Sequence, residues 1–157
     1  MKAQRYIISV VVLVLIVTLS TVFFLDVPNR IHLIARENSI LTSNASSISF
    51  IIRNNSFRSI LYGEFFQVEK WNDGNKTWGY YNDKPDEPFR DGLGLLQINP
   101  LCKKERVYNL RQYSDVYENG RYRIVQVIEL FNSNSARETN REFKVYGEFE
   151  IVTNLNR

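Results

Sequence analysis

A run of 20 residues without a charged side chain, residues 6–25, limits what the first part of this chain can fold into. As an α-helix that rises about 1.5 Å per residue it would be roughly 30 Å long, the thickness of the hydrocarbon core of a bilayer. No polar face interrupts the run, whereas a helix packed on a soluble core needs one. The sequence therefore predicts a single-pass transmembrane helix.

The charges that flank the run predict its orientation. Lys2 and Arg5 precede it and Asp26 follows it. The positive-inside rule then places the N-terminus in the cytoplasm and the remainder outside the cell membrane. We expect residues 1–28 to form a cytoplasmic start and anchor, and residues 29–157 to form one extracytoplasmic domain.

A cleaved secretory signal is the alternative interpretation of the same run, because it also has a basic start and an apolar middle. The apolar region of a signal is usually about 7 to 15 residues long and is followed by small residues at the cleavage site. Here the run is longer and ends in bulky side chains, residues 22–25. These features favour a retained anchor, with secretion after signal cleavage as the alternative.

The charge of the remaining chain argues against a nucleic-acid partner. Removing Lys2 and Arg5 from the 20 Lys and Arg residues leaves 18 cations against 17 Asp and Glu. Nucleic-acid binding normally needs a concentrated basic face. The one basic cluster, residues 103–106, is interrupted by Glu105 and is expected to be a solvated loop or strand edge.

The residue types that carry most catalysis and metal binding are scarce in this chain. Cys102 and His32 are single, so the chain cannot form an internal disulfide or a site with several His ligands, and Cys102 is expected to be a half-buried thiol. No Gly-x-Ser-x-Gly, His-Glu-x-x-His or phosphate-loop motif occurs. We expect a non-catalytic protein without a metal or cofactor.

Alternation of apolar and polar residues with a period of two predicts short strands after residue 30. Ile48, Phe50 and Ile52 share one strand face, and Phe143, Val145, Phe149 and Ile151 share another. A polar Asn- and Ser-rich loop is expected over residues 37–47. The expected strands lie within residues 31–35, 48–53, 66–71, 77–81, 107–110, 121–130 and 142–152, with a short edge strand within 93–98. About seven strands predict an all-β, two-sheet sandwich.

One predicted hairpin contains the best candidate binding surface. Residues 72–75 include Asp-Gly, a pair suited to a turn that needs a positive φ. The strands on either side contain Trp71, Trp78, Tyr80 and Tyr81. Aromatic side chains on two hairpin strands can form a stacking platform for sugars or peptides, although cross-strand and core packing explains the same residues.

The longest expected connection, residues 82–100, gives a third hypothesis. It contains Pro85, Pro88 and Pro100, so a continuous strand is not expected there. A long loop on a rigid scaffold can occupy a protease or receptor cleft. The chain could then act as an inhibitor or sensor domain.

Residues 118–124 resemble a tyrosine corner of immunoglobulin-like sandwiches. In that resemblance Gly120 and Tyr122 are structural: the Tyr122 ring packs inward and its hydroxyl bonds to nearby backbone. Ile124 stands where such domains usually carry a disulfide cysteine, which implies a variant without that disulfide.

Together with residues 47–56 and Tyr62-Gly63, this motif is similar to bacterial immunoglobulin-like domains of cell-envelope proteins, over roughly residues 31–152. The resemblance implies a spacer, adhesion element or protein-binding module. We therefore expect a membrane-anchored, extracytoplasmic binding or structural module whose partner is another envelope protein. Binding of a glycan through the Trp71 and Trp78 hairpin is the alternative.

Overall fold

The computed structural model describes residues 2–25, 27–41, 45–82, 94–131 and 142–153. Over these residues the chain forms one long helix, two short 3-10 turns and ten strands. The helices are α1 (Lys2–Leu25), η1 (Pro28–Arg30) and η3 (Leu110–Gln112). The strands are β1 (Ile31–Ala35), β2 (Ser39–Leu41), β3 (Ser47–Asn54), β4 (Ile60–Tyr62), β5 (Gln67–Asn72), β6 (Thr77–Tyr80), β7 (Leu96–Ile98), β8 (Lys103–Asn109), β9 (Gly120–Leu130) and β10 (Glu142–Val152).

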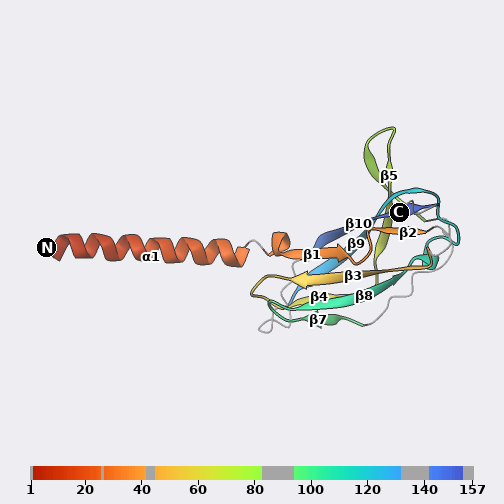
Figure 1. Cartoon of the computed structure of the whole chain (residues 1–157). Coiled ribbons are helices and arrows are strands. Elements are labelled where there is room, and N and C mark those ends of the chain that lie inside the picture. Colours follow the sequence, from red (N-terminus) through yellow and green to blue (C-terminus); the bar gives the residue numbers. More distant parts are fainter. Residues whose placement is uncertain (1, 26, 42–44, 83–93, 132–141, 154–157) are drawn as a thin grey trace.

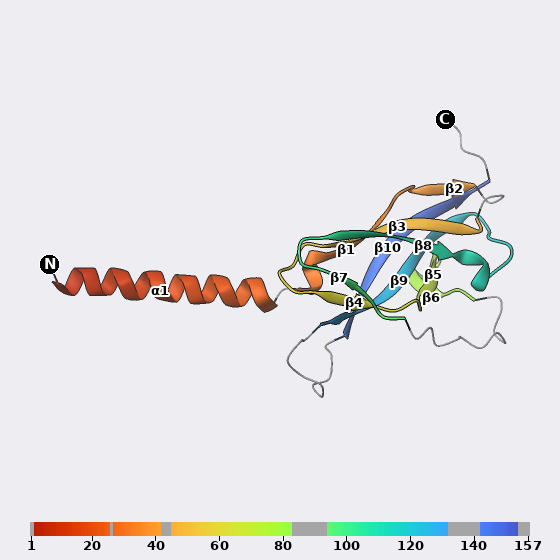
Figure 2. The same cartoon turned by 90° about the horizontal axis from the view of Figure 1, so that it is seen from below.

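Helix α1 extends away from the strands in both views (Figures 1 and 2). Bulky apolar side chains between Ile7 and Val17 are exposed. Within the part of the chain that the structure describes, no helix has the length and apolar character needed to cross a membrane. The transmembrane anchor at residues 6–25 stays a prediction.

The strands form two sheets, which confirms the predicted all-β sandwich. One sheet has the order β1-β3-β8. The other begins β2-β10-β9, and the free edge of β9 pairs with both β4 and β5, which pair in turn with β7 and β6. Apolar side chains from both sheets meet in one buried core. The short edge strand expected within residues 93–98 is present as β7.

The expected number of strands, about seven, is too low for the described residues because two extended segments are each divided. The first segment leaves the β1-β3-β8 sheet and joins the other sheet as β2, parallel to β10. The polar loop expected over residues 37–47 is therefore wrong in part: Ile40 is buried and anchors a three-residue strand. The second divided segment forms β4 and then β5 on the same edge of β9.

The basic run at residues 103–106 lies in β8, at the edge of its sheet. The expectation of a solvated run is correct for Lys103 and Lys104, which are exposed. It is wrong for Arg106, which is half-buried because its side chain points between the sheets and bonds to backbone there. Cys102, expected to be half-buried, is exposed because it lies in the turn that precedes β8.

The two sheets approach each other closely where Phe50 of β3 meets Gly147 of β10. Phe50 is fully buried, and its ring packs edge-on against Tyr108 and Phe149. A Cβ atom built at Gly147 would overlap the Phe50 ring and would lie 2.9 Å from Cγ of Leu33. Glycine at this position is therefore required by the close approach of the opposite sheet.

Replacing Gly147 with alanine should destabilise the sandwich by about 1–3 kcal/mol, because the added methyl group overpacks the core. The measurement is the denaturant midpoint of unfolding. Gly79→Ala in β6 is the matched control, since a Cβ at Gly79 meets no atom within 4 Å. Equal midpoints for Gly147→Ala and the parent chain would contradict this packing.

Candidate binding surface

The hairpin of β5 and β6 positions the aromatic residues that the sequence singles out. Trp71 lies directly opposite Trp78, and Glu69 lies opposite Tyr80, so these four side chains share one face. Figure 1 shows the hairpin projecting beyond the rest of the sandwich. This projection arises because β5 pairs with β9 only as far as Lys70 and then continues with β6 alone.

The hairpin turn is predicted correctly, but the reason for it is different. Four residues separate Asn72 from its partner Thr77, and the positive φ of 55° falls on Lys76 rather than on Gly74. The Asn72 side chain stabilises the turn by accepting a hydrogen bond from the backbone N–H of Gly74 at 2.9 Å. The Trp71 indole N–H donates to Asp73 at 2.9 Å.

The two tryptophan rings contact the side chains of β9, which lies beside β5. The ring centres of Trp71 and Trp78 are 5.3 Å apart, at 62° to each other. The guanidinium carbon of Arg121 is 5.3 Å from the centre of the Trp71 ring and 5.8 Å from that of Trp78. These distances are in the range of cation–π attraction.

Arg123 extends this arrangement to β10. Its guanidinium carbon lies 4.5 Å from the centre of the Trp78 ring and 4.4 Å from that of Tyr146. We call Trp71, Trp78, Arg121, Arg123 and Tyr146 the Trp–Arg ladder. It crosses four strands on the outer face of the larger sheet.

Two carboxylates balance the charge of the ladder. Arg123 pairs with Glu69 at 2.5 Å, and both side chains are largely buried. Arg121 pairs with Glu148 at 3.0 Å in a more exposed position. The first pair fixes the Arg123 plane between two rings, and the second pair, being exposed, contributes less to stability.

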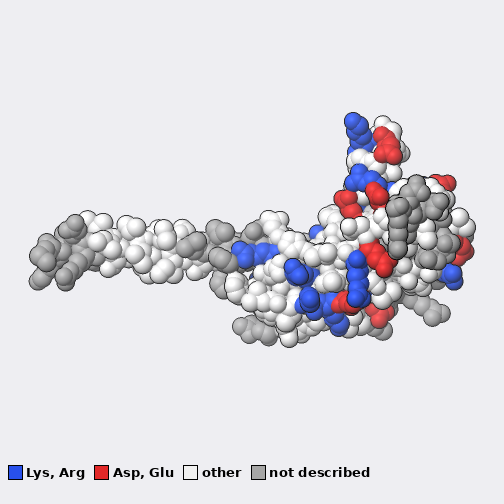
Figure 3. Space-filling model, in the orientation of Figure 1, with Lys and Arg blue, Asp and Glu red and all other residues white. Residues whose placement is uncertain are grey.

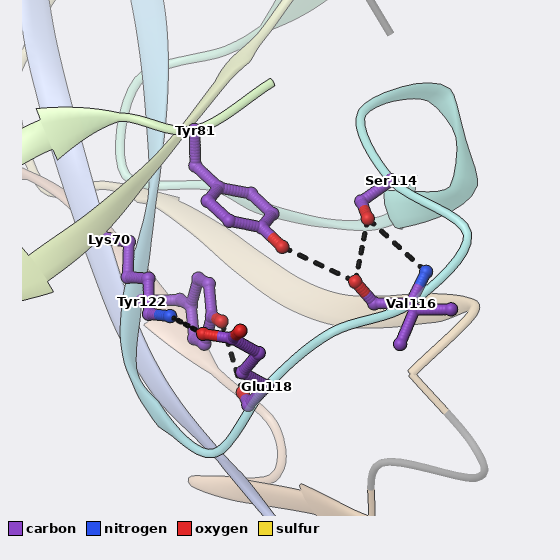
Figure 4. Close-up of polar contacts among 6 residues, drawn as sticks. All are labelled: Lys70, Tyr81, Ser114, Val116, Glu118 and Tyr122. Atoms are coloured by element: carbon purple, nitrogen blue, oxygen red, sulfur yellow. Dashed lines mark hydrogen bonds and ion pairs between the residues drawn. The ribbon is translucent and has the colours of Figure 1, made fainter. Parts of the chain in front are cut away.

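Tyr80 and Tyr81 do not belong to the ladder, although the sequence groups them with the tryptophans. Tyr80 is exposed on the ladder side of β6. Tyr81 points the other way: its ring packs against Tyr117 and Tyr122, and its hydroxyl donates to the carbonyl of Val116 at 3.3 Å (Figure 4). The interpretation of these four aromatics as one surface is wrong for Tyr81, because neighbouring strand residues face opposite sides.

The structural residues Gly120 and Tyr122 lie at the start of β9. Tyr122 is fully buried, and its hydroxyl donates to the carbonyl of Glu118 at 3.0 Å (Figure 4). Lys70 reaches over this corner and pairs with the Glu118 carboxylate at 2.5 Å. Gly120 has a φ of 154°, a conformation that residues with a Cβ rarely adopt.

A cluster of polar side chains, Arg106, Tyr108 and Gln126, lies between the two sheets. Arg106 donates to the carbonyl of Gly63 at 2.6 Å and to the side-chain oxygen of Gln126 at 2.7 Å. The same oxygen accepts from the Tyr108 hydroxyl. Burial raises the pKa of Tyr108, and the Arg106 charge offsets part of that rise. These bonds satisfy polar atoms between the sheets, so we assign the group a structural role.

Sequence reasoning missed Arg121, Arg123 and Tyr146 as members of the surface. Arg121 and Arg123 are two residues apart and therefore face the same side of one strand, which is a visible signal. Their proximity to the tryptophans depends on the pairing of β5 with β9, which the sequence does not state. Among the described residues, no cluster of three His, Cys, Asp or Glu could hold a metal ion. Residues 83–93 of the proposed inhibitory loop lie outside the described residues.

No family model and no curated protein matches this chain. A solved ASH/PapD-like domain of human CEP192 (PapD-like domain 7) is similar with a TM-score of 0.35 and 10% identity, covering 78% of this chain and 85% of that one. Pseudomonas fluorescens alkylpurine DNA glycosylase AlkC, bound to DNA containing an abasic site analog, has a TM-score of 0.35 and 11% identity, covering 77% of this chain and 29% of that one. Similarity at this level assigns neither a family nor a function.

Replacing Trp78 with alanine should lower the free energy of unfolding by about 1–2 kcal/mol, since it removes one aromatic pair and two cation–π contacts. Tyr80→Ala, a neighbouring exposed aromatic on the same strand, should change it by less than about 0.5 kcal/mol. Denaturant unfolding of both variants measures the difference. Equal effects would mean that the ladder contributes nothing to hairpin stability.

Replacing Tyr122 with phenylalanine should cost about 0.5–1.5 kcal/mol, because the hydrogen bond from the buried Tyr122 hydroxyl to the carbonyl of Glu118 is lost. Tyr122→Ala should cost about 3–5 kcal/mol, because it also removes the packed ring. Tyr146→Phe is the control for loss of an exposed hydroxyl. If Tyr122→Phe unfolds at the same midpoint as this control, the hydroxyl bond is unimportant.

Proposed function

We propose that this chain is a non-catalytic binding or structural module held at the outer face of a cell membrane by residues 6–25. The observation that carries the proposal is the exposure of the apolar side chains of α1. Ten bulky residues between Ile7 and Val17 are each 44–63% exposed. Over residues 7–17 Ser9 alone interrupts the apolar side chains, and a helix surface of this kind is costly in water and favourable in lipid.

The hydroxyl side chains of Thr18 and Ser20 in α1 also support a lipid environment for this helix. The Thr18 hydroxyl donates to the carbonyl of Val14 at 2.9 Å, and the Ser20 hydroxyl donates to that of Ile16 at 2.7 Å. Hydroxyls satisfied within their own helix need no water, which suits a hydrocarbon surrounding. Lys2 and Arg5 before the run favour a cytoplasmic N-terminus.

An immunoglobulin-like topology is proposed for the sandwich on two observations. In immunoglobulin-like sandwiches one sheet contains the first, second and fifth strands, and the facing sheet contains the third, sixth and seventh. Here β1, β3 and β8 form one sheet, and β4/β5, β9 and β10 are neighbours in the other. Tyr122 sits near the start of β9, with its hydroxyl bonded to backbone four residues upstream. The departure is β7, which pairs with β4 rather than with β8. We propose a spacer or binding domain of the cell envelope, a role with which this topology is compatible.

The Trp–Arg ladder is the surface we propose for a protein partner. Trp, Tyr and Arg are the residues enriched at energetic centres of protein interfaces, and here neighbouring strands hold them in fixed positions. A glycan is the second candidate ligand. It is less favoured because guanidinium groups already lie over the Trp71 and Trp78 rings, which sugar stacking would need. Binding of oligosaccharides by the parent chain but not by Trp78→Ala would reverse this preference.

Alkaline extraction of membranes from cells that express the full chain tests the anchor. The parent chain should stay in the membrane pellet. The double variant Leu13→Arg, Val17→Arg should be extracted, because each charge near the middle of a spanning helix costs about 2.5–3.5 kcal/mol. Val116→Arg is the matched control, since Val116 is an exposed apolar residue of the sandwich.

Release of the parent chain into the soluble fraction would contradict the anchor. N-terminal sequencing of the mature protein separates the remaining alternative. A chain that begins after residue 25 would identify a cleaved signal and a secreted domain.

A further inference from the structure

Two loops gather at the end of the sandwich nearest α1. The loop between β3 and β4 and the turn between β7 and β8 are joined by a hydrogen bond from the N–H of Leu101 to the carbonyl of Ser56 at 3.2 Å. The N–H of Asn55 donates to the carbonyl of Arg30, the last residue of η1, at 2.9 Å. This helix-proximal end is therefore tied to the segment that leads into α1.

Large apolar side chains are exposed at the helix-proximal end. Phe57 is 51% exposed, Leu101 is 63% exposed, and Phe131 is 39% exposed. Phe131 belongs to the same end, because its N–H donates to the carbonyl of Ser59 at 3.1 Å. Three such side chains on neighbouring loops form an apolar tip that water does not favour.

The backbone conformation of Leu101 is also unfavourable. Its φ is 58°, in the left-handed region where glycine and asparagine are common and a bulky residue is an outlier. A leucine that is both exposed and held in this conformation contributes little to folding. Backbone outliers of this kind are often associated with function.

Cations surround this tip. Arg53 of β3 lies directly opposite Lys103 of β8, and two like charges at facing strand positions repel each other. Lys104 follows Lys103 and is exposed. Figure 3 shows Lys and Arg gathered at the end of the sandwich beside α1, whereas acidic and basic residues are mixed farther away.

Among the described residues, three carboxylates lie near this end. Glu105 is on the same face of β8 as Lys103 and pairs with Arg36 at 2.8 Å. Glu129 and Glu142 are cross-strand neighbours on the outer face of the larger sheet. The basic row of Arg53 and Lys103 belongs to the smaller sheet. A negatively charged surface could therefore approach the loops and the basic row without meeting Glu129 and Glu142 first, and the charge of Glu105 is offset by its pair with Arg36.

We propose that the helix-proximal end docks on an anionic bilayer surface, with Phe57 and Leu101 in the interfacial layer and Arg53, Lys103 and Lys104 against lipid headgroups. This inference rests on the proposed membrane anchor. Apolar side chains beside cations form the pattern that binds anionic membrane surfaces. The domain then stands in a fixed orientation and presents the Trp–Arg ladder away from its docked end.

Cys102 supplies the probe for a test, because it is the single cysteine, is exposed and lies between Leu101 and Lys103. The full chain is labelled there with a small environment-sensitive fluorophore. It is then reconstituted into vesicles of phosphatidylcholine, with or without phosphatidylglycerol. Quenching by a headgroup spin-labelled lipid and by aqueous acrylamide is compared.

Docking predicts strong quenching by the labelled lipid and protection from acrylamide in anionic vesicles only. Arg53→Glu and Lys103→Glu should each lower the docked population several-fold, since one cation near an anionic leaflet favours the bound state by about fivefold. Lys76→Glu, at the exposed tip of the hairpin, is the control and should leave the quenching unchanged.

The Leu101→Asn variant distinguishes a role of Leu101 in membrane docking from a role in the stability of the fold. Asparagine tolerates the left-handed conformation, so this variant should unfold at the same or a higher denaturant concentration than the parent chain. Its label should nevertheless be quenched less by the spin-labelled lipid. Loss of docking together with loss of stability would assign Leu101 to the fold and overturn its role at the membrane.

The possible failures are distinguishable. A chain that resists alkaline extraction from the vesicles but whose label is equally open to acrylamide in both lipids leaves the anchor intact and overturns docking. Protection that does not depend on lipid charge, or on Arg53 and Lys103, also overturns it and indicates contact with protein instead. A chain that does not associate with either vesicle overturns both proposals.

Discussion

The contact between the Phe50 ring and the backbone of Gly147 is the constraint on which the rest of the sandwich depends. Phe50 packs on Tyr108 beside it in the smaller sheet and on Phe149 in the facing sheet. The ring can do both only because Gly147 has no Cβ to separate the sheets. This close approach sets the distance between the sheets, and with it the burial of the aromatic core.

Strand β9 connects this packed core to the surface residues of the Trp–Arg ladder. Tyr122 and Ile124 point into the core, while Arg121 and Arg123 point outward to the tryptophan rings. β10 lies along one edge of β9, and β4 and β5 lie along the other. The hairpin and the ladder are therefore positioned by a strand whose inner face is fully packed. The proposed binding surface is built on a rigid support for this reason.

The sequence predicts the strands with strong alternation and misses those without it. The run with Ile48, Phe50 and Ile52 and the run from Phe143 to Ile151 each place alternate residues in the core, so their burial follows from the pattern. β2 and β4 have three residues each, too few for a period to be visible. The ladder depends on which strands become neighbours. Pairing between segments over 50 residues apart, such as Glu69 with Arg123, is set by tertiary packing.

The most direct test of the account is the side of the membrane on which the sandwich lies. The Cys102→Ser, Val116→Cys variant carries its single thiol on the exposed surface at residue 116, far in sequence from α1. Intact cells that express this full-length variant are treated with a membrane-impermeant maleimide, and the labelled fraction is compared with that after lysis. We predict that the thiol is labelled to the same extent in both and that the labelled chain stays in the membrane fraction. Labelling only after lysis would place the domain inside the cell and would contradict the account.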